Sequence, residues 1–332
     1  MKVSSHAHSS IDQAVAHPSK IAEPGLHSLE MSLVKTVAYA DIYDYPLRVE
    51  EAWRYLIGIP ASLEEVRQAL SGGTIIGQLI SQSQGYLTLH GREGLAELRR
   101  ERERESNRLW PLAIHYGRLM AHLPFIRMVA VTGALAMDNV NHRRDIDYLV
   151  ITQEGRLWLC RAMVILLVRW AANRGIALCP NYFLSENALS LRQRDLYTAH
   201  ELIQMVPLFG SGTYGRFRRL NRWTEDHLPN ARGMDPPKLA NIKLSPHGQQ
   251  LAIESPLRTH IEKMLRSPLG DWLEAWEMNR KVRKLSAVQP PQNGREEAQF
   301  SPQWCKGHFD GHAVRALKEY SSRLQRIAGF PV

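Results

Sequence analysis

The chain has 332 residues, of which 44% are hydrophobic, so it is long enough to fold as two or three domains. No apolar run reaches the roughly 18 residues that a transmembrane helix needs, so we expect no membrane partner. The formal net charge of +9 favours polyanionic partners such as nucleotides or nucleic acid. Three widely spaced cysteines provide no disulfide framework, which indicates a reducing compartment and a cytoplasmic location.

The N-terminal part of the chain predicts a tail, a small module and a long helix. Residues 1–28 are rich in Ser, His and Pro and predict a disordered tail. Residues 29–95 contain helical patterns, including a capping box at Ser62 and Glu65, followed by the strand-like segment GYLTLHG. Helices followed by a β wing resemble a winged-helix module. Residues 96–124 predict a charged connecting helix.

The predicted winged-helix-like module lacks the charges that a DNA reader needs. A recognition helix usually carries Arg or Lys to the phosphates and bases. Between Arg67 and Arg92 the chain has neither. We therefore expect this module to pack or to bind a partner protein, and not to bind DNA.

Residues 125–228 predict an α/β core with a mixed sheet, and residues 229–332 predict a C-terminal helical region. In the core, FIRMVAVTG, DIDYLVIT and IALCPNYFLS read as strands, with a helix between the second and the third. From Asp195 onward the pattern is helical, and SAVQPPQNGREEAQFSP predicts a flexible linker before the last helix.

Two carboxylates at the start of the second core strand predict a metal site. In a strand Asp145 and Asp147 share one face, with Cα atoms about 6.6 Å apart at roughly 3.3 Å per residue. Their repulsion is relieved by a divalent cation, Mg²⁺ or Mn²⁺, which takes oxygen ligands and commonly bridges to phosphates. Gly133, at the end of the preceding strand, lets backbone amides approach a phosphate. Together these residues predict a site for a metal-bound polyphosphate.

The order Gly133-Ala134, ten residues, then Asp145-Ile146-Asp147 entering the apolar YLVI resembles the signature of polymerase-β-type nucleotidyltransferases. The resemblance covers residues 126–185. It implies metal-dependent transfer of a nucleoside monophosphate from a nucleoside triphosphate to an acceptor, with release of pyrophosphate. The acceptor is a small molecule, an RNA or a protein.

Several further residues follow from that resemblance. Ala134 stands where the family has Ser, so Thr132 or Asn139 would replace the hydroxyl contact to phosphate. Asn181 stands where the third carboxylate is usual, with Glu186 beyond the strand end. The basic residues before the aspartates would hold a triphosphate or form an exposed loop; they are His142, Arg143 and Arg144.

Other signals leave alternatives open. His200 and Glu201 lie on a helix that would border the acceptor, as a general base or as a solvated surface. FGSGTYGRFRR contains GxGxxG but follows no strand, and we interpret it as a flexible loop before a basic helix that could face a nucleotide or RNA. Cys305, His308 and His312 have metal-like spacing without a matching second pair. The alternative function is a catalytically inactive protein that binds nucleic acid or a partner as a regulator.

Overall fold

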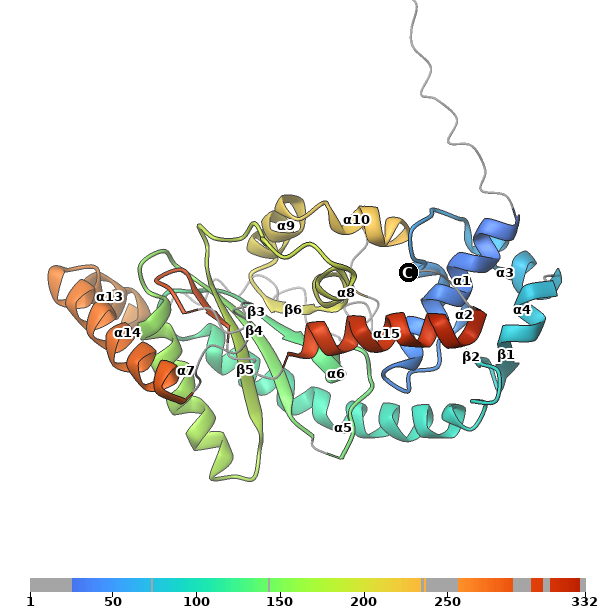
Figure 1. The fold of residues 1–332 in the computed structure, drawn as a ribbon. Coiled ribbons are helices and arrows are strands. Elements are labelled where there is room, and N and C mark those ends of the chain that lie inside the picture. The colour runs from blue at the N-terminus through green and yellow to red at the C-terminus, as the bar shows by residue number, and fades with distance from the viewer. Residues whose placement is uncertain are drawn as a thin grey trace, which may run out of the picture.

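The computed structural model describes residues 26–72, 74–142, 144–233, 236, 256–288, 300–306 and 311–328. These residues form a mixed α/β protein around a five-stranded mixed sheet, with a separate two-stranded hairpin (Figure 1). Residues 1–25 of the predicted tail and most of the predicted linker lie outside the described ranges, and the last three tail residues already belong to the first helix. In the described ranges, every helix is too short or too polar to cross a bilayer.

The N-terminal module consists of four helices and the hairpin: α1 (Leu26–Asp41), α2 (Val49–Arg54), α3 (Leu63–Gly72), α4 (Thr74–Leu79), β1 (Ile80–Ser83) and β2 (Tyr86–Leu89). The predicted capping box starts α3, because Ser62 Oγ accepts from the Glu65 amide at 3.1 Å and the Glu65 carboxylate accepts from the Ser62 amide at 2.6 Å. The hairpin turns at Gln84 and Gly85, both with positive φ, as a two-residue hairpin loop requires.

The long helix α5 (Leu95–Ala121) ties this module to the core. Near its start, the buried Arg99 forms ion pairs of 2.8 Å with both Glu51 and Glu103 and lies 3.8 Å from the centre of the Tyr45 ring. Near its end, the Ala113 carbonyl accepts a 2.7 Å hydrogen bond from the Tyr148 hydroxyl of the central sheet. Helix α5 therefore contacts the module near its start and the sheet in its second half, and so holds the module and the sheet together.

The sheet has the strand order β6-β3-β4-β5-β7. Its strands are β3 (Ile126–Thr132), β4 (Ile146–Thr152), β5 (Leu178–Ser185), β6 (Val206–Phe209) and β7 (Trp304–Lys306). β4 and β5 are parallel and are joined by α7 (Leu157–Ala172), whereas the other neighbours pair antiparallel. Parallel neighbours need such a crossover connection.

The alternation of side chains along β4 separates two cores. Tyr148 and Val150 pack with residues of α5 and α7 on one face, while Leu149 and Ile151 pack on the other face with Leu202 and Phe217. The second face is covered by α8 (Leu196–Gln204) and α9 (Ser211–Leu220), which lead into α10 (Thr224–His227) and the 3-10 turn η1 (Pro229–Ala231). Asp145 and Asp147 share this second face by the same alternation.

Two segments differ from the helical pattern expected after Asp195. The VPLF run forms the edge strand β6, and Trp304–Lys306 forms β7, so the C-terminal region completes the core sheet and is not purely helical. Apolar runs this short fit either a strand or a buried helix, and strand pairing decides between them. The helices α13 (Pro256–Leu265) and α14 (Pro268–Val288) pack near α7, while α15 (His312–Ala328) crosses to the N-terminal module (Figure 1).

Candidate functional site

The turn between β3 and the four-residue helix α6 (Gly133–Ala136) lies directly against the second aspartate. Thr132 and Asp147 are register partners on β3 and β4. Gly133 has φ +64°, and a Cβ added to it would lie 2.5 Å from Asp147 Oδ2. Glycine therefore serves here both for the left-handed backbone and for the close approach. The turn and the carboxylate form one unit.

Asp145 and Asp147 lie together with Cys179 of the neighbouring strand. In the described part of the chain, one ligand atom from each of the three lies within 4.8 Å of the others. Burial first, and then the charges of Asp145 and Glu201, raise the pKa of Asp147 to about 7. Burial and the two aspartates raise the pKa of Cys179 to about 11, so its thiol stays protonated at neutral pH.

Asn181 reaches the aspartates through an irregularity in β5. Tyr148 pairs with Pro180 and Leu149 pairs with Tyr182, so Asn181 is the extra residue of a bulge. Bulges re-aim side chains, and here the Asn181 amide donates to Asp147 Oδ1 at 2.5 Å. This contact lowers the pKa of Asp147, opposing the effect of burial. The residue at the expected third position is thus brought to the aspartates.

The third carboxylate of the site comes from helix α8. Glu201 is close enough to raise the pKa of Asp147, and burial raises the pKa of Glu201 itself to about 7. Lys306 of β7 lowers the pKa of Glu201. One turn earlier on α8, the charge of Glu201 is the main cause of the raised pKa of Tyr197. Glu201 therefore acts electrostatically on Asp147 from α8, outside the close group that Asp145, Asp147 and Cys179 form in the described part of the chain.

These residues fit a hard divalent cation. Carboxylate and amide oxygens are the ligands that Mg²⁺ and Mn²⁺ prefer. Burying Asp147 beside Asp145 is costly unless a positive charge compensates the pair. Asp145 and Asp147 would hold the ion, while the protonated Cys179 is a poor ligand for such a metal.

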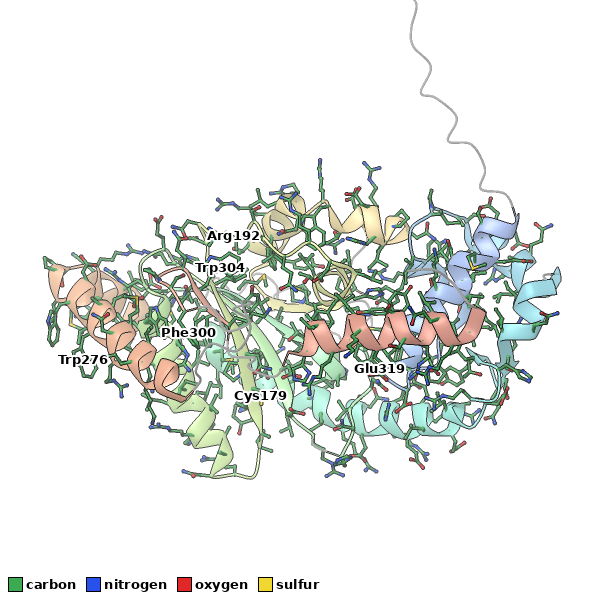
Figure 2. The ribbon with its side chains drawn as sticks, viewed as in Figure 1. Cys179, Arg192, Trp276, Phe300, Trp304 and Glu319 are labelled. Atoms are coloured by element: carbon green, nitrogen blue, oxygen red, sulfur yellow. The ribbon has the colours of Figure 1, made fainter. Side chains whose placement is uncertain are left out.

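A cavity of about 690 Å³ has Thr132, Asn181 and Glu201 in its wall. Asp145 and Asp147 do not line it, but Thr132 pairs with Asp147 and Asn181 donates to it, so the cavity lies next to the aspartates. Its other polar lining comes from Arg192, Gln193, Asp195, Tyr197, Thr198, Lys306 and Lys318. Its apolar lining comes from Leu149, Tyr182, Leu191, Leu202, Met205, Phe217, Trp304, Ala313, Val314 and Leu317. Figure 2 shows Arg192 and Trp304 of this lining beside the central sheet. The volume is that of a typical small-molecule site.

Two of the predicted phosphate contacts, Arg144 and Asn139, are already engaged by protein groups. Arg143 lies outside the described residues. Arg144 forms a 2.9 Å ion pair with Glu105 on α5. The side chain of Asn139 accepts from Arg102 at 3.1 Å and donates to the Tyr43 carbonyl at 3.1 Å, so it ties the turn to α5 and the module. Thr132 and the backbone of Gly133 and Ala134 remain at the carboxylates.

Two predicted acceptor-side residues are not brought to the cluster. Glu186 follows the end of β5, opposite the end that carries Cys179, and accepts from the Glu154 amide at 3.3 Å. At roughly 3.3 Å per residue it lies on the order of 20 Å along the strand from Asp147. His200 is buried, with its ring stacked 4.0 Å from that of Tyr39 and its Nδ1 3.0 Å from the Leu196 carbonyl. Burial lowers its pKa to about 4, so His200 is a neutral core residue.

The two weaker motifs have structural explanations. The prediction that FGSGTYGRFRR is a loop that follows no strand was wrong, because the motif directly follows β6 and opens α9. Within it only Gly210 adopts positive φ, at +82°, before α9 begins at Ser211. Cys305 is buried in β7 and His312 begins α15, so these two residues do not share a helix. His308 lies outside the described residues.

Comparisons with protein-family models, curated proteins and solved structures find no significant match to the chain. Its function is therefore inferred from the residues that the fold brings together. Sequence reasoning missed the cavity, because its walls come from segments distant along the chain. The only indication of this cavity in the sequence was the aromatic Trp304 and the basic Lys306, which stand close together in a region expected to be helical.

Proposed function

We propose that the protein is a metal-dependent nucleotidyltransferase, which moves a nucleoside monophosphate from a nucleoside triphosphate to an acceptor and releases pyrophosphate. One observation carries the proposal: Asp145 and Asp147 share a face of β4 directly against the positive-φ turn at Gly133. The order and spacing of these residues also follow the nucleotidyltransferase signature. The mixed sheet with helices on both faces is compatible with that fold.

Some residues of the site would bind the nucleotide and its metal ion, and another would transfer a proton. The backbone of Gly133 and Ala134, with the Thr132 hydroxyl, would hold the phosphates at the turn. Asp145 and Asp147 would hold Mg²⁺ or Mn²⁺, which would supply positive charge to neutralise the triphosphate. Positioning of the acceptor against the α-phosphorus supplies most of the acceleration in such a transfer.

Glu201 is the candidate general base. It lies in the wall of the cavity that adjoins the aspartates, and its pKa of about 7 is matched to neutral pH. An acceptor in the cavity would present a hydroxyl or amine to Glu201, which takes the proton as the new oxygen–phosphorus or nitrogen–phosphorus bond forms. The electron pair of the breaking bond leaves on pyrophosphate.

The test is release of pyrophosphate from each labelled nucleoside triphosphate with Mg²⁺ or Mn²⁺, with and without cell extract as a source of acceptor. We expect Asp147→Asn and Asp145→Asn to abolish turnover in folded protein. Glu186→Gln is the matched control, because Glu186 lies at the other end of β5, and it should keep full activity. Full activity of Asp147→Asn would contradict the proposal.

One observation favours a second candidate, a catalytically inactive regulator. The Asn181 amide nitrogen, where a metal-binding carboxylate would be usual, occupies Asp147 Oδ1. Such a regulator would bind a nucleotide in its α/β core and a partner other than DNA through its winged-helix-like module. RNA is one of the ligands to test. Calorimetric binding of a nucleoside triphosphate without pyrophosphate release in any extract would favour it.

A further inference from the structure

A second cavity, of about 460 Å³, lies on the other side of helix α9 from the carboxylates. Phe217 of α9 lines the cavity beside the aspartates, whereas Tyr214 and Arg218 of the same helix line this one. The remaining walls come from the edge strand β6, from α10 and from the segment that ends at Gly233. Helix α9 is thus a shared wall, and the second cavity belongs to a separate site.

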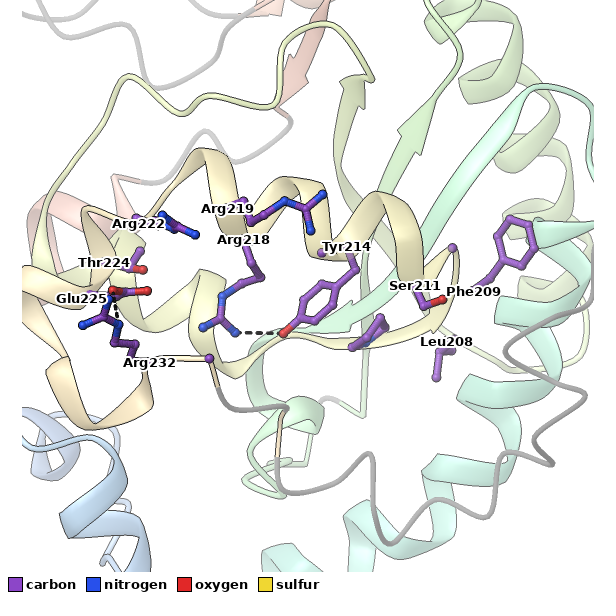
Figure 3. A pocket seen from close by; sticks show the side chains of 14 residues that line it. Leu208, Phe209, Ser211, Tyr214, Arg218, Arg219, Arg222, Thr224, Glu225 and Arg232 are labelled. Atoms are coloured by element: carbon purple, nitrogen blue, oxygen red, sulfur yellow. Dashed lines mark hydrogen bonds and ion pairs between the residues drawn. The ribbon is translucent and has the colours of Figure 1, made fainter. Parts of the chain in front are cut away.

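The second cavity is lined by an excess of positive charge. Arg218, Arg219, Arg222 and Arg232 line it together with one acidic residue, Glu225. Glu225 is already paired with Arg232 at 3.2 Å. Figure 3 shows Arg222 and Arg232 toward one end of the cavity, Arg218 and Arg219 beside Tyr214, and Ser211 and Phe209 toward the other end.

Two of these arginines are available to a ligand. Arg218 donates to the Tyr214 hydroxyl at 3.0 Å and to the Ala231 carbonyl at 3.3 Å, so it helps to shape the wall. Arg219 and Arg222 are exposed, and within the described ranges the side chain of neither has an ion pair or a hydrogen bond. Unpaired guanidinium groups in a hollow are suited to bidentate contacts with phosphate oxygens.

Tyr214 gives the cavity an aromatic wall that suits an organic group. Leu208 and Phe209 also line the cavity, but their side chains pack against the core on the α5 side of the sheet. A cavity of this size holds a small molecule, whereas a nucleic-acid strand needs a basic track that continues beyond a single hollow. The start of α9 at Ser211 adds backbone amides to the lining.

We propose that this cavity is a second ligand site, which binds a phosphorylated small molecule of nucleotide size through Arg219 and Arg222. The phosphate groups contact the guanidinium groups, and the organic part lies against Tyr214. The inference is independent of the proposed transferase activity, because neither Asp145 nor Asp147 contributes to this cavity.

Equilibrium dialysis of the full chain against ATP in EDTA tests the proposal, because EDTA removes the divalent ion needed at the aspartates. We expect ATP to bind, and the double variant Arg219→Ala/Arg222→Ala to weaken binding by at least about tenfold, since each lost charge-assisted hydrogen bond is worth about that much. Arg216→Ala is the matched control: Arg216 is exposed on the same helix, lies outside the cavity lining, and should leave the affinity unchanged. Circular dichroism confirms that the variants are folded.

Three results would overturn the proposal. One is equal ATP affinity of the double variant and the wild type. Another is loss of binding in Asp147→Asn, which would place the nucleotide at the carboxylates. The third is tight binding of another ligand in place of ATP. Tight binding of inorganic phosphate alone would assign the arginines to a free anion, and tight binding of a ten-nucleotide RNA would assign them to an RNA backbone. If turnover fails in every extract while ATP still binds through Arg219 and Arg222, the second site stands without the proposed function.

Discussion

Replacing Gly133 with Ala tests two requirements of the turn: a positive φ, and the absence of a Cβ beside Asp147. Gly133 has φ +64°, where an L side chain costs about 1–2 kcal/mol. In addition, the new Cβ would lie 2.5 Å from Asp147 Oδ2, so the carboxylate must move. Its other oxygen accepts from Asn181, and a hydrogen bond to a charged group is worth about 1.5–3 kcal/mol.

Gly155→Ala supplies the matched control. Gly155 has φ +68°, and a Cβ there would meet no described heavy atom within 4 Å. This variant therefore carries the backbone cost alone. We expect both variants to lose about 1–2 kcal/mol in free energy of unfolding, with Gly133→Ala losing up to about 3 kcal/mol more if the Asn181 contact is broken.

Urea unfolding with and without Mn²⁺ measures both effects. A ligand at a hundredfold excess over its dissociation constant stabilises the folded state by about 2.7 kcal/mol. Wild type and Gly155→Ala should show this increment, and Gly133→Ala should not, because its carboxylate is displaced. Equal stability of the two variants, together with equal stabilisation by Mn²⁺, would refute the reasoning.

Three further predictions concern stability. His200→Phe should make the free energy of unfolding depend less on pH between about 4 and 6.5. The reason is that burial lowers the pKa of His200 to about 4 in the folded protein, against about 6.5 in the unfolded chain. The unfolded chain therefore binds the proton first, and wild-type stability should fall by up to about 3 kcal/mol as the pH drops from 6.5 to 4, measured by urea unfolding. Arg99→Met should cost about 3–5 kcal/mol by thermal unfolding, because two carboxylates lose their buried cation, whereas Arg100→Met, at a side chain 43% exposed, should cost under about 1 kcal/mol. Glu274→Gln should lower the melting temperature, with a cost of about 1–2 kcal/mol, because its carboxylate accepts from the second and third amides of α7, those of Trp158 and Leu159, at 2.7 and 2.8 Å.

Features determined by neighbouring residues could be predicted from the sequence. The capping box at Ser62 formed as expected, because the Ser and Glu that satisfy each other's amides are three residues apart. Period-two alternation likewise placed Asp145 and Asp147 on one face of a strand, and the structure pairs Asp147 with Thr132 before the Gly133 turn.

Features that depend on distant pairing could not be predicted. The strand β7 exists because Tyr182 pairs with Lys306, and nothing within its three residues distinguishes it from a loop. The carboxylate that accompanies the aspartates is Glu201 of a helix, and not a residue of the third strand, since it is the packing of α8 on the sheet that brings it there. A bulge aims Asn181, and bulges leave little trace in a single sequence.

The return of β7 and α15 to the core has a consequence for synthesis on the ribosome. Glu201 and the sheet face beneath it emerge more than a hundred residues before Leu317, which helps to close the cavity. At about 5–20 residues per second, that delay is on the order of ten seconds. During it, Leu149, Leu202 and Phe217 lack the wall that later covers them. We therefore expect the nascent chain to present an apolar surface long enough for a chaperone to bind, and the walls of the cavity to be complete only after α15 has emerged.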